Sequence, residues 1–290
     1  AVACGLVDFS LGTDSAGSIR VPASLCGVYG MRPTMHRISE AGVLPFVPSS
    51  STVGALAGNI NTLDKVMRVL LRSEDIVSEK INNIYVLEDA FSISDLNISA
   101  LIKKRIKLLS ESEGVNVTPV FLHEIIDERV DLEALNVDVL RPLQTFEFMN
   151  TVGSWIESAS PEQSPFFAVK YKTVRGFSRK EVNTALLRCE KYYKRIHSFI
   201  KKGDLLVFPT VPTIAPLKGS LQHMETALDF YDRTMAITSF SGVGRLPEIT
   251  FPVGVINNAP VGMSVVAGFY QDEFLIAAMK KVLAKFAVSS

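Results

Sequence analysis

The spacing of apolar and polar positions predicts that strands and helices alternate along the chain. Residues 84–87 form a short apolar run typical of a buried strand, and residues 94–110 repeat apolar positions at helical spacing. Residues 115–121 alternate apolar and polar positions, as a second strand does. A strand, a helix and a strand in this order indicate a βαβ unit, and hence a protein of the α/β class.

The second half of the chain continues this alternation. Residues 178–202 predict a long helix that ends at Gly203, and residues 205–208 are a continuous apolar run typical of a strand buried on both faces. Further elements are expected as a helix at 132–151 broken near Pro142, a helix at 226–239, strands at 248–253 and 260–267, and a closing helix at 272–286. No repeat or shift in composition divides the chain, so one domain is expected over residues 1–290.

The first third of the chain has a less regular pattern. Residues 1–34 are small, apolar and rich in glycine, a composition that lets backbone segments approach one another or a ligand closely. Residues 35–62 are predicted to be loop, and a helix is expected at 63–71 with Thr62 as its N-cap. The chain opens inside an apolar stretch that reads like the middle of a packed element, so we expect upstream sequence of the same fold to precede it.

Composition argues against several classes of function. The 290 residues include 30 basic and 30 acidic side chains, a balance that argues against a nucleic-acid partner. No apolar run is long enough for a membrane-spanning helix. The histidines and the three cysteines are scattered without metal-ligand spacing, so no metal site is expected, and a reducing, cytoplasmic compartment is favoured.

The segment 12–23 carries the chemistry that can be recognised in this chain. Its serine, Ser18, follows small residues that allow a tight turn, where successive backbone N–H groups can converge on an anion. Asp14 and Arg20 flank the turn and would hold its shape if they were buried as a pair. A phosphate-binding loop or a structural turn is the alternative, although the segment lacks the lysine and the glycine spacing of phosphate loops.

This segment resembles the signature of the amidase signature family, serine hydrolases that cleave carboxamides. The stretches 25–34, 204–212, 246–254 and 259–268 are similar to later parts of the family's sequence and follow in the same order. Residues 7–14 and 143–148 look most similar to the plant branch, which holds indole-3-acetamide amidases and amidase-like receptors of the chloroplast outer envelope.

The resemblance implies an α/β fold in which a large mixed sheet is covered by helices on both faces, in one domain that lacks its N-terminal part. It implies a Ser–cis-Ser–Lys triad in which Ser18 is the nucleophile and Asp14 and Arg20 brace the loop. The backbone amides implied to form the oxyanion hole are those of Ser15, Ala16, Gly17 and Ser18. The resemblance implies no cofactor.

One departure from the family's pattern concerns the base. The resemblance places the bridging serine just upstream of the first residue and the lysine further upstream, so neither lies within the 290 residues. A serine hydroxyl is a weak nucleophile without a base. Ser10 and Ser24 lie nearby in the sequence, and both are expected to be structural rather than to replace the bridging serine.

Three functional hypotheses follow. The first is an amide hydrolase whose small-molecule substrate is an aryl acetamide such as indole-3-acetamide, with Phe46, Phe148 and Trp155 as pocket or plain core residues. The second is an inactive, plastid-associated scaffold for protein interaction. The absence of a 34-residue repeat disfavours this hypothesis. The third is an amidotransferase subunit. The partners expected are the amide substrate, the upstream segment and a second copy of the chain in a homodimer.

Overall fold

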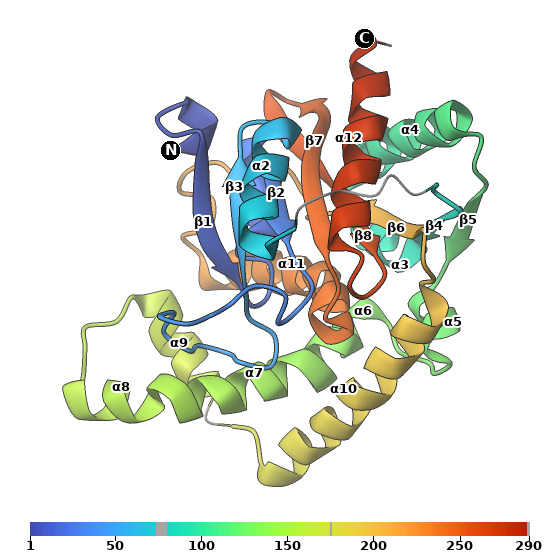
Figure 1. Cartoon of the computed structure of the whole chain (residues 1–290). Coiled ribbons are helices and arrows are strands. Elements are labelled where there is room, and N and C mark those ends of the chain that lie inside the picture. The colour runs from blue at the N-terminus through green and yellow to red at the C-terminus, as the bar shows by residue number, and fades with distance from the viewer. Residues whose placement is uncertain (74–79, 175, 289–290) are drawn as a thin grey trace.

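The computed structural model describes residues 1–73, 80–174 and 176–288, and its centre is one mixed sheet (Figure 1). The eight strands lie in the order β1-β3-β2-β7-β8-β6-β4-β5. β4 pairs in parallel with β5 and β6, and the other neighbours are antiparallel. The strands are β1 (Phe9–Asp14), β2 (Tyr29–Arg32), β3 (Thr52–Ala57), β4 (Asn83–Leu87), β5 (Val117–Val120), β6 (Asp204–Pro209), β7 (Glu248–Ile256) and β8 (Ala259–Ala267).

Helices cover both faces of this sheet, which confirms the predicted fold class (Figure 1). One face carries α2 (Ile60–Leu71), α4 (Leu96–Glu113) and α12 (Asp272–Val288). The opposite face carries α1 (Arg20–Cys26) and α11 (Met224–Gly244). In β2, Gly30 approaches Ala23 of α1, and the side chain of the next residue, Met31, points to the other face of the sheet. Successive residues of a strand therefore face the two helical layers.

The predicted βαβ unit is confirmed as β4, α4 and β5, and the apolar run at 205–208 is confirmed as β6. All six residues of β6 are buried, which explains why its sequence shows no alternation. Two short helices, α3 (Glu88–Ser92) and α5 (Leu122–Ile126), flank this unit, and a third, η1 (Val2–Cys4), precedes β1. Among the described residues, no helix is long and apolar enough to cross a bilayer.

The prediction that Pro142 breaks a helix is wrong. The helical run from 132 to 159 is continuous, and Pro142 lies in the first turn of a segment that follows a π-helical stretch. Proline lacks the N–H that a regular helix interior uses, and a π-helical stretch is a known way in which a helix accommodates such an irregularity without ending. The segments are α6 (Leu132–Ala134), the π-helices η2 (Leu135–Leu140) and η3 (Met149–Gly153), α7 (Arg141–Phe148) and α8 (Ser154–Ala159), followed by α9 (Pro165–Val174) and α10 (Arg179–Phe199).

Two further predictions need correction. The region 35–62, predicted to be loop, contains β3, whose small and apolar residues pair with β1 and β2 on either side. The helix predicted from 63 begins at Ile60, and its N-cap is Asn59, whose side chain accepts a hydrogen bond from the Thr62 amide at 2.9 Å. The Asn59 side chain thus satisfies one of the free amides of the first turn, the role predicted for Thr62.

Candidate active site

The conspicuous loop of the sequence, residues 15–19, connects the end of β1 to the start of α1. Asp14 is the last residue of β1 and Arg20 is the first residue of α1, so the two charged residues stand at the two ends of the loop. Gly17 has a φ of 114°, and a Cβ atom there would lie 2.9 Å from the Thr238 methyl group of α11. The loop therefore requires glycine at this position both for its backbone angle and for its close approach to α11.

A buried carboxylate, Asp14, holds the loop from beneath. Its oxygens accept hydrogen bonds from the amides of Gly17 at 2.8 Å and Ile19 at 3.2 Å. The same carboxylate meets the Arg20 guanidinium twice, at 3.0 Å from Nε and 2.9 Å from Nη2. Burial alone would raise the pKa of Asp14, but the Arg20 and Arg32 guanidinium groups hold that pKa well below its usual range.

Two residues with no role assigned from the sequence complete this network. Arg32 of β2 donates to the Asp14 carbonyl at 2.5 Å, and Glu248 of β7 accepts from Arg20 Nη1 at 2.8 Å. Arg32 and Glu248 stand directly opposite each other in the β2–β7 register. We call Asp14, Arg20, Arg32 and Glu248 the charge cluster. No part of their side chains is exposed, and two positive charges balance two negative charges.

Ser18 lies above the charge cluster and is exposed. Its hydroxyl forms no hydrogen bond with the described residues. Ser15 differs, because it is buried and its hydroxyl lies 2.5 Å from that of Ser51. Ser10 is half-buried on the edge strand β1, and Ser24 is buried on α1 against the backbone of β8. Among the four serines of this region, Ser18 combines exposure with a free hydroxyl group.

The loop amides are oriented by the partners of the carbonyl groups. The Ser15 carbonyl accepts from Gln144 Nε2 at 2.9 Å, and the Ala16 carbonyl accepts from Thr238 Oγ1 at 2.8 Å. In a trans peptide the next N–H points away from that carbonyl. The Gly17 amide, predicted as an oxyanion donor, donates to Asp14 instead. The other three predicted amides, of Ser15, Ala16 and Ser18, have no hydrogen-bond partner among the described residues.

Aromatic side chains gather beside the loop along α7. Phe148, one turn after Gln144, packs edge-on against Phe46 with ring centroids 5.1 Å apart and against Phe167 at 6.1 Å. Of the three residues predicted as pocket or core, Phe46 and Phe148 therefore come together. Trp155 is 59% exposed and forms no ring contact with them.

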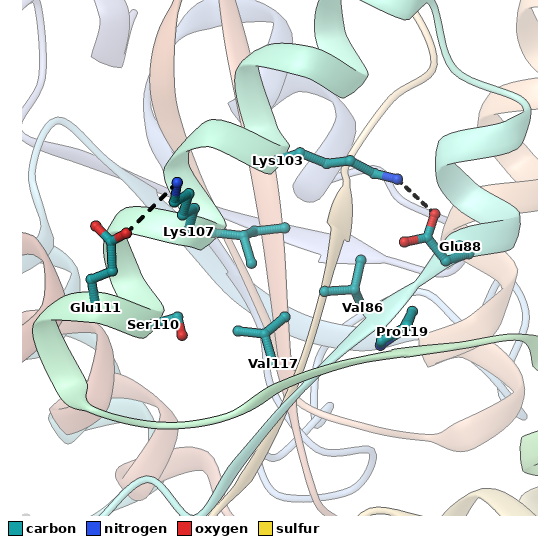
Figure 2. A pocket seen from close by; sticks show the side chains of 9 residues that line it. Val86, Glu88, Lys103, Lys107, Ser110, Glu111, Val117 and Pro119 are labelled. Carbon is teal, nitrogen blue, oxygen red and sulfur yellow. Dashed lines mark hydrogen bonds and ion pairs between the residues drawn. The ribbon is translucent and has the colours of Figure 1, made fainter.

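A hollow near β4 and β5, away from the Ser18 loop, has an apolar floor and exposed ion pairs at its rim. Figure 2 shows it between α4 and strands β4 and β5, with Val86 and Val117 on its floor. Its volume is about 460 Å³, and ion pairs of Lys103 with Glu88 and of Lys107 with Glu111 lie at its rim (Figure 2). Its Ser110 hydroxyl donates to the Val115 carbonyl at 2.8 Å, so the hollow offers no free nucleophile among its lining residues. In the described part of the chain, no three His, Cys, Asp or Glu residues could together hold a metal ion.

Comparison with known proteins agrees with this geometry. The family model described as "Amidase" matches residues 1–160 and 165–276. The chain is 30% identical to Amidase 1 of Arabidopsis thaliana, over 98% of this chain and 72% of that protein. It is 26% identical to Translocon at the outer membrane of chloroplasts 64 of Pisum sativum, over 97% of this chain and 50% of that protein.

The solved structures share this fold. A crystal structure of an amidase superposes with a TM-score of 0.82 at 22% identity, over 98% of this chain and 64% of that one. The chain thus spans between half and three quarters of these proteins. The matched ranges include the loop, the charge cluster and all eight strands of the sheet. This chain belongs to the amidase family.

Proposed function

We propose that the protein hydrolyses a carboxamide C–N bond and that Ser18 is the nucleophile. The observation that carries the proposal is an exposed, unpaired serine hydroxyl on a loop whose backbone is fixed by a buried carboxylate. Ser18 Oγ attacks the amide carbonyl carbon, the C–N bond breaks, and ammonia or an amine leaves with the proton that the hydroxyl has lost. Water then hydrolyses the ester of the acyl-enzyme and releases the acid. The Ser15, Ala16 and Ser18 amides are the proposed donors to the oxyanion.

The mechanism also needs a base that takes the Ser18 proton. Asp14 is unsuited to this role because its pKa is held low and its two oxygens already accept hydrogen bonds. Arg20 is unsuited because, although burial alone would lower its pKa, Asp14 and Glu248 keep that pKa above its ordinary value. We propose that a lysine acts through a bridging serine, as the family resemblance implies.

The proposed substrate is a small aryl acetamide such as indole-3-acetamide. Its support is the aromatic group around Phe148, on the helix whose Gln144 binds the loop. Aromatic side chains favour flat apolar groups through offset and edge-on packing. The similarity to Amidase 1 supports the same class of reaction.

An inactive scaffold is the second proposal, and one comparison favours it. The chain is 27% identical to Outer envelope protein 64, chloroplastic, of Arabidopsis thaliana. If the protein is a scaffold, we expect it to be associated with plastids and to bind protein partners. If it is an enzyme, we expect it in the cytoplasm.

The test is hydrolysis of indole-3-acetamide, phenylacetamide and acetamide, followed by chromatography of the acid product. We expect the two aryl acetamides to be hydrolysed faster than acetamide, and Ser18→Ala to abolish both reactions. Ser10→Ala is the matched control, a serine-to-alanine change on the neighbouring edge strand. Hydrolysis that persists in Ser18→Ala would remove Ser18 from the mechanism, and a folded wild type without hydrolysis would favour the scaffold.

A further inference from the structure

Glu248 is a fully buried carboxylate at the first residue of β7. It accepts three hydrogen bonds: from Arg20 Nη1 at 2.8 Å, from Ser241 Oγ at 2.5 Å and from Ser264 Oγ at 2.5 Å. One guanidinium and two hydroxyl groups therefore converge as donors on the two oxygens of this carboxylate.

The charge of Glu248 completes an electrical balance. Without it, two buried arginines, Arg20 and Arg32, would face the single carboxylate of Asp14. An unbalanced charge in a site closed to water is costly, because the protein interior screens it poorly. Glu248 thus makes it possible for two arginines to lie beneath the loop.

Glu248 also fixes the orientation of the Arg20 guanidinium toward Asp14. Glu248 and the Thr238 carbonyl both bind Arg20 Nη1, at 2.8 and 3.1 Å. This leaves Nε and Nη2 as a planar fork for the Asp14 carboxylate. A guanidinium is rigid, so fixing one nitrogen sets the direction of the other two.

The last link runs from Asp14 to the nucleophile. The two amides that Asp14 binds most directly belong to Gly17 and Ile19, the residues on either side of Ser18 in the chain. The backbone of Ser18 is held from both sides by one carboxylate. Any shift of Arg20 is passed to Asp14 and from there to the nucleophile.

We propose that Glu248 is a positioning residue for Ser18, acting through Arg20 and Asp14, and this deepens the proposed function. Its charge and its three hydrogen bonds set the orientation of the Arg20 guanidinium. The role differs from the bracing by Asp14 and Arg20, because Glu248 lies on the far strand β7, more than two hundred residues along the chain from the loop. It ties the loop to the centre of the sheet.

The test compares amide hydrogen exchange by mass spectrometry in Glu248→Gln and the wild type, over overlapping peptides covering 12–20. Glu248→Gln keeps the size of the side chain and removes the charge. We expect the loop amides to exchange at least about tenfold faster, the size of a free-energy change of about 1.4 kcal/mol, while a peptide covering β6 stays unchanged. Equal protection of the loop in both proteins, or a uniform loss over the whole molecule, would overturn the proposal.

The matched control is Asp272→Asn, which also removes the charge of a buried carboxylate. Asp272 binds Thr34 and lies outside the charge cluster. It should leave exchange in 12–20 unchanged. If Glu248→Gln does not fold, Ser264→Ala removes one of the three hydrogen bonds without changing the charge. This variant should raise exchange in the same peptide by a smaller factor, and no increase there would overturn the proposal.

A second readout separates this inference from the proposed function. If Ser18 is reactive, Glu248→Gln should lower kcat by at least about tenfold and leave KM within about twofold, because the charge cluster is fully buried and closed to a ligand. Glu248→Asp, which keeps the charge, should recover part of the rate. If the wild type has no activity, the proposed function fails while the exchange experiment still decides the positioning role.

Discussion

Two ion pairs of the same length lie in opposite surroundings in this molecule. Near the centre of the sheet, Arg20 and Glu248 of β7 lie 2.8 Å apart with no exposed side-chain surface. Beside the β4–β5 end, Lys103 and Glu88 also lie 2.8 Å apart, but their side chains are 50% and 23% exposed. Distance alone does not distinguish the two pairs, whereas burial does. Water screens the second pair and competes for it, so the first is far more costly to disrupt.

The position of the hollow also differs from that of the buried charges. The hollow of about 460 Å³ lies at the end with the exposed pairs, and its floor is formed by apolar residues such as Val86, Ile106 and Val117. The exposed serine lies on the loop that the buried charge cluster holds. In this chain, the position of the proposed chemistry follows the buried charges rather than this hollow.

The largest effect expected from this comparison is that of Asp14→Ala. It leaves Arg20 and Arg32 without their shared carboxylate and releases the Gly17 and Ile19 amides. Breaking a buried ionic network by removing one partner costs on the order of 3–5 kcal/mol. The matched change beside the β4–β5 end, Glu88→Ala, should cost about 1 kcal/mol or less.

Urea denaturation of the two variants measures this difference directly. Asp14→Ala should lower the midpoint strongly or prevent folding, and Glu88→Ala should leave it close to that of the wild type. Equal shifts of the urea midpoint in the two variants would mean that burial does not determine how much these ion pairs contribute to stability.

A pair of glycines gives the next largest effect. Gly17→Ala forces a Cβ to within 2.9 Å of Thr238, whereas Gly114→Ala at the end of α4 meets no atom within 4 Å. Gly114, with a φ of 63°, lies in the left-handed region, where alanine costs about 1–2 kcal/mol, whereas Gly17, with a φ of 114°, lies outside it and is more strained as alanine. Overpacking should add about 1–3 kcal/mol at Gly17 alone. Thermal unfolding should therefore show a larger loss of stability for Gly17→Ala, and an equal loss in the two variants would show that the loop can move away from α11.

His197 is a half-buried titratable group, intermediate between the buried charge cluster and the exposed pair of Lys103 and Glu88. Its ring packs at 3.9 Å from that of Tyr193, and its Nε2 lies 2.9 Å from the Gly244 carbonyl. Burial lowers the pKa of His197 below its usual value, outweighing the opposite effect of the Gly244 contact. Below about pH 6.5 the unfolded chain binds a proton that the folded protein resists, so stability falls as the pH drops from about 6.5 through the folded pKa.

His197→Gln should therefore have a smaller loss of stability than the wild type between about pH 7.5 and pH 5, measured as the change in urea midpoint. The variant removes the titrating ring and keeps a side chain that can donate to Gly244. An identical pH dependence in both proteins would contradict the direction of the pKa shift.

Much of the sheet could be predicted because burial leaves a clear pattern in sequence. Strands β4 and β6 were predicted from short apolar runs, α4 from apolar positions at helical spacing, and β5 from alternating apolar and polar positions. Strand β3 was missed because its small residues and neighbouring prolines and serines look like loop. In α10 the apolar Leu186 and Leu187 are 50% and 74% exposed, whereas the smaller Ala185 and Cys189 are buried. Helical spacing alone did not reveal which side of α10 faces the core.

The candidate site was predictable only where it is continuous in sequence. Ser18, Asp14 and Arg20 belong to one short motif, so a single reading brings them together. Arg32 and Glu248 come from strands β2 and β7, and they meet because of the register of the sheet. A charged residue within an otherwise apolar strand was the available signal, but its partner depends on pairing that the sequence does not display.

The most direct test of the central claim is intact mass spectrometry after treatment with a fluorophosphonate probe, followed by peptide mapping. The wild type and Ser10→Ala should each gain one adduct on the peptide that contains Ser18, and Ser18→Ala should gain none. That result would show that Ser18 is an activated nucleophile on this loop. A folded wild type that stays unlabelled, or an adduct that persists in Ser18→Ala, would contradict the account.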